Sequence, residues 1–185
     1  MKTLFAILLS ACTCLTSCTD FVSNTKPVVS NPSADDLGII GDWNLPKSDE
    51  QSTQEWIHIS LAAHSKSTYE ITLHSGKTTS QFTLKCEPLK QDSEFLLLQL
   101  NAKNSDSYFF GYATVQKDAM RFWMVSAEKL TAELKDRNIN SVIDRGFFST
   151  ETTVDSADLK KLLLENPRKL APTHGDATRI TKNGK

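Results

Sequence analysis

The sequence has no excess of charge of either sign. Its 21 lysine and arginine residues are matched by 22 aspartate and glutamate residues, and the formal net charge is −1. Proteins that bind nucleic acid through its phosphates carry a basic balance or a basic patch. The composition therefore gives no support for a nucleic-acid partner.

The sequence also lacks the short motifs that mark common catalytic and metal sites. It has no G-x-S-x-G nucleophile elbow, no H-E-x-x-H, no P-loop, no EF-hand loop and no cysteine pair spaced for a metal. The adjacent carboxylates Asp35-Asp36 and Asp49-Glu50 fall in polar stretches where water keeps both groups ionised, whereas general acid catalysis needs a raised pKa. We therefore expect no enzyme, no metal and no cofactor.

Cysteine is scarce, and three of the four cysteines lie within the first eighteen residues. This segment has the parts of an export signal, since Lys2 is followed by an apolar stretch over residues 4–9 and then by small residues. The apolar stretch is too short to span a bilayer as a helix, which takes about 20 residues. The sequence predicts that residues 1–17 are a signal peptide.

Leu15-Thr16-Ser17-Cys18 resembles the lipobox of bacterial lipoproteins, in which a large aliphatic residue and two small residues precede an obligatory cysteine. The resemblance implies diacylglycerol on the Cys18 thiol, cleavage after Ser17 and acylation of the new amino terminus. Two or more acyl chains give a stable membrane anchor, at roughly 0.8 kcal/mol per buried methylene. The alternatives are the lipobox-like Leu9-Ser10-Ala11-Cys12, with Cys12 lipidated, and a plain secretory signal.

The residue after the anchor bears on which membrane holds the protein. It is Thr19, whereas an aspartate at that position in enterobacterial lipoproteins resembles a retention signal for the inner membrane. We therefore expect the periplasmic face of the outer membrane. The inner membrane is the alternative, because Asp20 follows one place later.

Residues 18–37 are predicted to be the lipidated cysteine and a flexible tether. They are rich in Ser, Asn, Asp and Pro and have no sustained hydrophobic period, so they cannot bury enough apolar surface to fold alone. As flexible coil, such a segment reaches on the order of 25 Å. Local packing of Val22, Val28 and Val29 is the alternative.

Residues 38–170 form one predicted β-rich domain. Polar and apolar residues alternate in its first half with the period of two that is typical of half-buried strands. The Gly76-Lys77 turn sets the register, opposing Ile71 to Phe82 and Tyr69 to Leu84 on the inward face. Cys86 has the inward phase, so it is predicted to be a buried small hydrophobe and not an exposed nucleophile. The strands predicted in this half cover residues 39–45, 56–61, 69–73 and 81–86.

Two later segments, residues 94–100 and the hairpin 108–125, are apolar on both faces. The first is expected to be a strand that is covered on both sides or lies in the middle of the sheet. In the hairpin, the face with Phe110, Tyr112 and Trp123 must either be covered by another element or serve a ligand or partner protein. A helix over residues 127–137, with Ser126 as its N-cap, is the candidate cover. The sequence leaves both alternatives open.

The C-terminal part is predicted to contain a last strand over residues 147–154 and a short helix. Asp155 caps this helix, and Pro167 closes it. Residues 171–185 contain turn residues and positive charge but no apolar face, so they are predicted to be a disordered tail.

Gly41-Asp42-Trp43, followed by antiparallel strands, resembles the opening of small lipocalin-like barrels, in which a tryptophan after glycine on the first strand plugs one end. Residues 108–170 are also similar to the carboxyl half of certain bacterial lipoproteins whose families have no established activity. The predicted fold class is mainly β (α+β), an antiparallel meander or small lipocalin-like barrel with one or two short C-terminal helices.

The histidines give one pattern with metal-ligating residue types. His58, His74 and Glu70 project from the same face of neighbouring strands in the predicted register. Histidines on a solvated strand face are the simpler interpretation, and we expect no metal site.

These features together predict a membrane-anchored, periplasm-facing lipoprotein that is a binding or envelope assembly module. A carrier for a small apolar ligand or lipid is the alternative, and a hydrolase or metal-binding protein is less favoured. The expected partners are the membrane, through the lipid on Cys18, and an envelope protein or small apolar ligand.

Overall fold

The structure, a computed structural model, describes residues 21–24, 27–29, 37–47, 53–89, 92–103, 105–145 and 149–181. The predictions on Cys12, Cys18 and the signal peptide lie outside the described residues, as do Asp35, Asp36, Asp49 and Glu50.

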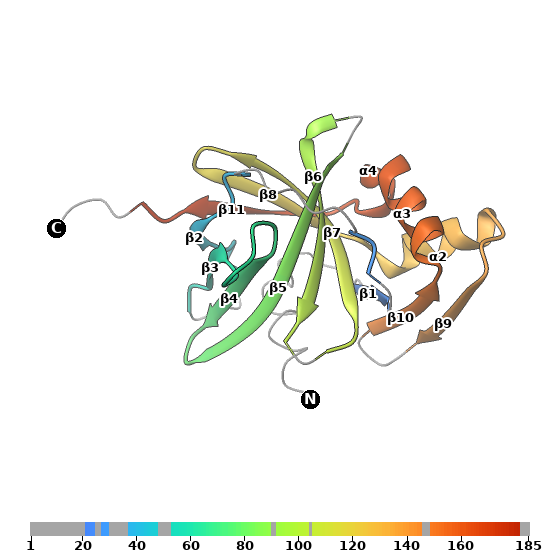
Figure 1. The fold of residues 1–185 in the computed structure, drawn as a ribbon, viewed down its shortest axis with the longest axis horizontal. Coiled ribbons are helices and arrows are strands. Elements are labelled where there is room, and N and C mark those ends of the chain that lie inside the picture. Colours follow the sequence, from blue (N-terminus) through green and yellow to red (C-terminus); the bar gives the residue numbers. More distant parts are fainter. Residues whose placement is uncertain are drawn as a thin grey trace.

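Eight antiparallel strands close into a barrel, which confirms the predicted fold class, mainly β with a small lipocalin-like barrel. The described residues form a few short helices, where one or two were predicted. Seven of them follow one another as a meander, and the eighth pairs with both the last and the first of these strands (Figure 1). The strands are β2 (Gly41–Asn44), β3 (Trp56–Leu61), β4 (Tyr69–Ser75), β5 (Thr78–Leu89), β6 (Asp92–Ala102), β7 (Tyr108–Gln116), β8 (Ala119–Met124) and β11 (His174–Arg179).

The strand register follows the turn chemistry and the alternation of apolar residues. Ile71 pairs with Phe82 and Tyr69 with Leu84, as predicted, and Gly76 in the β4–β5 turn has a φ of 57°, in the left-handed region that glycine enters without strain. A slip of one residue would exchange the two faces of each strand. The register therefore fixes which side chains point into the barrel.

The prediction of a disordered tail over residues 171–185 is wrong for residues 174–179, which form β11 between β8 and β2. The strand carries one buried apolar side chain, Ala177, so its sequence shows no apolar alternation. Its backbone pairs with a strand on each side, and Asp176 accepts a hydrogen bond from Arg121 Nε at 2.6 Å. Backbone pairing with β2 and β8 therefore stabilises β11, although the sequence of this segment carries no strand pattern of its own.

The prediction of a flexible tether over residues 18–37 is also wrong for two pieces of that segment. Phe21–Asn24 form β1, which pairs antiparallel with β7 and parallel with β10 (Ser149–Val154). Val28 and Val29 are buried, and Gln99 Oε1 accepts hydrogen bonds from their backbone N–H groups at 2.6 and 2.8 Å. Val28 and Val29 therefore pack locally, which was the alternative to a flexible tether. Gln99 of β6 makes this possible because it is a buried acceptor for their backbone N–H groups.

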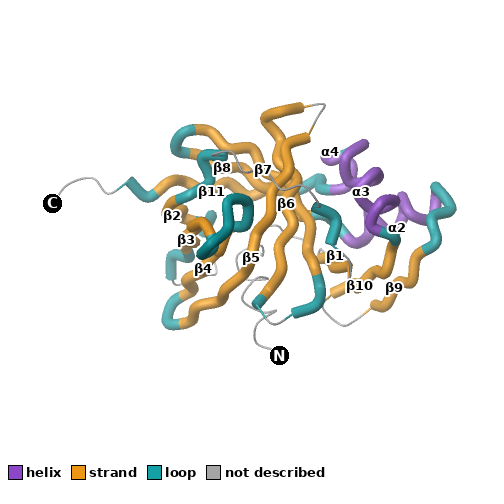
Figure 2. Tube along the Cα trace, in the orientation of Figure 1, coloured by secondary structure: helices purple, strands orange, loops and turns teal. Residues whose placement is uncertain are grey.

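Three helices cover the outer wall of the barrel on the side of β6 and β7 (Figure 2). They are α2 (Ala127–Asp136), α3 (Ser156–Glu165) and α4 (Pro167–Leu170). Ser126 and Asp155 are the N-caps of α2 and α3, as predicted, and accept hydrogen bonds from the Lys129 and Ala157 backbone N–H groups. Pro167 does not simply end α3 but opens α4, since proline is well suited to a first helical position. A strand that the sequence analysis missed, β9 (Ser141–Arg145), pairs with β10 beside the helices.

The barrel wall separates two hydrophobic cores. One fills the barrel interior, and the other lies between the outer wall and the helices. β6 contributes to both, since Leu96 and Leu98 belong to the interior core while Phe95 and Leu97 belong to the outer one. This explains the near-continuous apolar run of β6, a strand buried on both faces.

Candidate functional site

The face predicted from Phe110, Tyr112 and Trp123 is mostly core. Phe110 and Tyr112 are 1% exposed and pack with α2, α3 and α4, and Tyr112 donates a hydrogen bond from its hydroxyl to Leu163 O at 2.8 Å. Burial raises the pKa of Tyr112 well above its usual value. Of the two alternatives that the sequence left open, coverage by other elements therefore holds for these two residues, and they form no ligand or partner face.

Trp123 is the member of this face that keeps some exposure. Its ring lies 5.2 Å from the Phe95 ring and 6.0 Å from the His174 ring, measured between centroids. A cavity of about 670 Å³ on the outer wall is lined by Trp123, Phe95, Arg121, Asp176 and Arg168, among others. The Arg168 guanidinium lies 5.7 Å from the centre of the Phe95 ring. Trp123 thus belongs to a groove between the barrel wall and α4.

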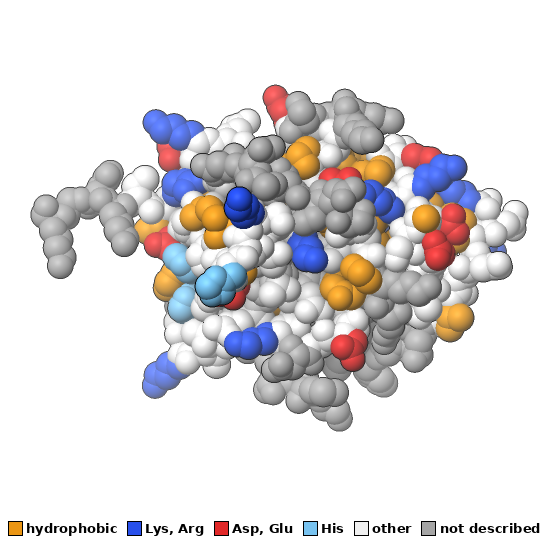
Figure 3. Space-filling view, viewed as in Figure 1, with side chains coloured by type: hydrophobic (Ala, Val, Ile, Leu, Met, Phe, Trp, Pro, Cys, Tyr) orange, Lys and Arg blue, Asp and Glu red, His pale blue; other side chains and the backbone are white. Residues whose placement is uncertain are grey.

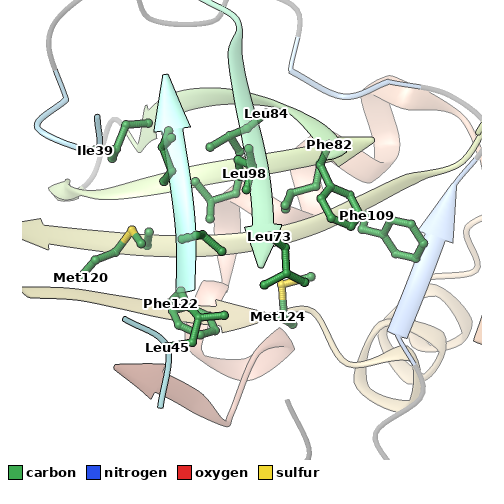
Figure 4. Close-up of a pocket in the computed structure, with 15 residues that line it drawn as sticks. Ile39, Leu45, Leu73, Phe82, Leu84, Leu98, Phe109, Met120, Phe122 and Met124 are labelled. Atoms are coloured by element: carbon green, nitrogen blue, oxygen red, sulfur yellow. The ribbon is translucent and has the colours of Figure 1, made fainter. Parts of the chain in front are cut away.

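A second cavity, of about 130 Å³, lies inside the barrel and is partly open. Every lining side chain is apolar, and Figure 4 shows these side chains extending from several strands toward the same space. The lining residues are Ile39, Leu45, Ile57, Ile59, Ile71, Leu73, Phe82, Leu84, Leu98, Leu100, Phe109, Ala113, Met120, Phe122 and Met124. A mostly apolar concavity in the mouth of a barrel is a typical binding site for a small molecule.

Trp43 and Arg179 are in contact where β2 pairs with β11. Trp43 is fully buried, its Nε1 donates to Ile39 O at 2.8 Å, and the Arg179 guanidinium lies 4.2 Å from the centre of its ring. Arg179 also donates to the carbonyl oxygens of Ile40, Gly38 and Lys117, the last in the β7–β8 turn. These hydrogen bonds and the cation–π contact hold the end of β11 against the segment before β2 and the β7–β8 turn.

The end of the barrel with the β4–β5 turn carries the half-buried part of the cavity lining. Ile57, Leu100, Phe122 and Met124 are the half-buried lining residues, and each lies toward the end of its strand on this side. The cavity therefore has its access at this end.

A polar cluster lies inside the barrel at this same end. The Glu55 side chain is in phase with Ile57 and Ile59 and is 2% exposed, and its Oε1 accepts a hydrogen bond from the Ser75 hydroxyl. Ser80, which faces Leu73 in the β4–β5 ladder, is 5% exposed. Within the described residues, Glu55 Oε2 and Ser80 Oγ are buried polar atoms without a hydrogen-bond partner. Sequence reasoning missed both, although each continues the inward phase of its strand.

The histidine pattern does not assemble into a metal site. His58 Nδ1 lies 2.6 Å from Asp42 Oδ1, and the His74 ring stacks on Trp56 with a centroid distance of 3.8 Å. Within the segments that the structure describes, no three His, Cys, Asp or Glu side chains group in a way that could hold a metal ion. Figure 3 shows histidine side chains gathered over β2 to β4, with charges of both signs scattered over the rest of this face.

Cys86 lies in the interior core and is fully buried. Burial raises the pKa of its thiol to about 12. A thiol that stays protonated is a poor nucleophile, so the environment of Cys86 suits packing and not covalent chemistry.

The fold and its interior define the class of the protein: a small closed antiparallel β-barrel of lipocalin-like architecture with an apolar cavity. Among the helices of the described residues, none has the length and apolar character needed to cross a membrane. The chain matches no protein-family model, no curated protein sequence and no solved structure.

Proposed function

We propose that the protein is a lipoprotein, acylated on Cys18 and facing the periplasm from the outer membrane, whose barrel binds a small apolar ligand and carries out no catalysis. The observation that carries the binding part is the interior cavity, because its lining is wholly apolar and it has access at one end. The anchor part is supported by the lipobox-like residues Leu15 to Cys18. A binding role is also consistent with the inert environment of Cys86.

The size of the cavity limits the ligand. An apolar cavity of about 150 Å³ lined by Leu, Ile and Phe is large enough to bind benzene. The interior cavity is of similar size, so the apolar part of the ligand is about as large as one benzene ring.

The binding part is tested with benzene on the mature chain lacking its acyl groups, residues 19–185. Benzene is expected to raise the thermal unfolding midpoint, since a ligand that binds only the folded state stabilises it. Ala113→Leu fills the cavity from β7 and is expected to abolish this rise, whereas Ala157→Leu makes the same change at an exposed position of α3. An unchanged midpoint in the wild-type chain at saturating benzene would contradict the proposal.

The anchor part is tested by feeding an alkyne-labelled fatty acid to cells that express the full chain. Cys18→Ala is expected to lose the label and leave the membrane fraction, while Cys12→Ala keeps both. The reverse pattern would assign the anchor to Cys12. Absence of the label from the wild-type chain as well as from both variants would indicate a plain secretory signal.

A second candidate function, docking of an envelope protein, is favoured by the groove that contains Trp123. A half-exposed tryptophan beside an arginine is a common feature of protein interfaces. Trp123→Asp separates the two roles of this residue: a folded variant that loses an in-cell crosslink to a partner supports docking, and an unfolded variant shows that Trp123 is needed for the core.

A further inference from the structure

The polar cluster at the open end of the barrel belongs to the same interior as the apolar cavity. Each polar residue is the inward-facing neighbour of a residue that lines the cavity. Glu55 comes two residues before Ile57, Ser75 two residues after Leu73, and Ser80 two residues before Phe82. Figure 4 shows Leu73 and Phe82 pointing toward the cavity. The interior is therefore apolar over most of its length and polar at its accessible end.

Other described residues supply hydrogen bonds to only part of the polar cluster. The hydroxyl of Ser75 donates to one carboxyl oxygen of Glu55, which leaves Glu55 Oε2 and Ser80 Oγ without partners among the described residues. Buried polar atoms are nearly always hydrogen-bonded, and leaving one unpaired is unfavourable. Glu55 comes just before β3 and Ser80 lies on β5, the two strands that flank β4, and both continue the inward phase next to residues that line the cavity. Two buried polar atoms placed in this way are the arrangement expected of a site that binds a polar group.

The chemistry of the two atoms specifies that group. Glu55 Oε2 accepts hydrogen bonds, and the Ser80 hydroxyl both donates and accepts. A head group with N–H or O–H donors satisfies both atoms, whereas a carboxylate has no donor to offer to Glu55.

We propose that the barrel binds a small amphiphile whose amine or hydroxyl head group donates to Glu55 and contacts Ser80, and whose apolar part fills the interior cavity. This inference rests on the proposed binding function and names the ligand class for the same site. The cavity volume of about 130 Å³ limits the apolar part to roughly the size of a six-carbon chain or ring.

The test compares three probes of one chain length, hexylamine, hexanol and hexanoate, with benzene as the headless reference. Binding of each probe to the mature chain, residues 19–185, is measured by calorimetry at constant pH and salt. Hexylamine and hexanol are expected to bind on the order of tenfold more tightly than hexanoate, the size of effect expected for a hydrogen bond to a charged or buried group.

Two variants remove the head-group contacts. Glu55→Leu and Ser80→Ala are expected to weaken hexylamine and hexanol on the order of tenfold and to leave benzene nearly unchanged. Matched controls make similar changes on the outer faces of the same sheet: Glu70→Leu, an exposed carboxylate of β4, and Ser60→Ala on β3. Neither control is expected to change the affinity for any probe.

The outcomes separate the two proposals. Benzene binding with equal affinities for the three probes would overturn the head-group assignment and leave the proposed apolar ligand in place. No binding of benzene or of any probe would overturn both. If Glu55→Leu fails to unfold cooperatively, Glu55→Gln takes its place, because glutamine keeps the shape of the side chain. Loss of the preference for hexylamine over hexanoate in Glu55→Gln is then the supporting result.

Discussion

Gln99, a polar residue in the apolar strand β6, attaches the segment with Val28 and Val29 to the barrel wall. It points away from the barrel interior, is 3% exposed, and its side-chain oxygen accepts the backbone N–H groups of both Val28 and Val29. A single acceptor thus holds a segment that lies about 70 residues away in sequence. The valines then add their side chains to the outer core.

Gln99→Leu is expected to destabilise the protein by about 1–3 kcal/mol, because two buried N–H groups lose their acceptor. Hydrogen exchange at the Val28 and Val29 amides is expected to become much faster, whereas exchange in β4 and β5 changes only as much as global stability does. Gln81→Leu is the control, since the Gln81 side chain is exposed and accepts a hydrogen bond from the Lys103 ammonium. Unaltered protection at Val28 and Val29 would show that side-chain burial alone holds the segment.

Among the elements, the three helices are tied to one another by a group of ion pairs. Glu133 of α2 bonds Lys169 of α4 and lies 3.4 Å from Arg137 Nε, and Arg137 in turn bonds Glu165 of α3. The hydrogen bond from Lys169 lowers the pKa of Glu133, and the hydrogen bond from Arg137 lowers that of Glu165. The folded state therefore binds protons less readily than the unfolded state at both carboxyls.

The sign of the pH dependence follows from these lowered pKa values. The stabilisation is fully present above the ordinary glutamate pKa of 4.5 and is lost as the pH falls through that value toward the lower folded-state values. The thermal unfolding midpoint is expected to drop over this acid range, and less steeply in Glu133→Gln than in the wild type. Glu128→Gln, at an exposed position of α2, serves as the control. Parallel curves for Glu133→Gln and the wild type would exclude Glu133 as a contributor.

The barrel depends on β11 for closure. Without it, β8 and β2 would each present an unpaired edge, and exposed edges favour aggregation. A chain that ends after Pro172 is expected to lose cooperative thermal unfolding and the near-ultraviolet circular dichroism of its tryptophans. A chain that ends after Thr181 is expected to keep both, and retention of both by the shorter chain would show that seven strands are sufficient.

At the scale of the whole molecule, the sequence predicts the meander well and its closure poorly. Strands with alternating residues, such as Trp56–Leu61, carry their own signal, and the Gly76-Lys77 turn fixes their pairing. β11 has no such signal, because its one buried side chain is Ala177 and its order comes from the strands beside it. β1 is similar, since its partners β7 and β10 lie far along the chain.

The same contrast holds for the candidate site. The inward phase of the strands predicts the apolar lining, but Glu55 and Ser80 lie at or beyond the ends of the predicted strands. Whether a polar residue at a strand end faces solvent or interior depends on how far the neighbouring strands extend. That property belongs to the assembled barrel and not to any one segment.

The pairing of β1 with β7 and β10 sets the number of residues between the ordered protein and the proposed lipid anchor. Cys18 precedes Phe21, the first residue of β1, by three residues, which span at most about 10 Å. If Cys18 carries the proposed lipid, the start of β1 lies within about this distance of the membrane surface. On that proposal, we expect a molecule that delivers a ligand to the barrel, or collects one from it, to approach the membrane surface.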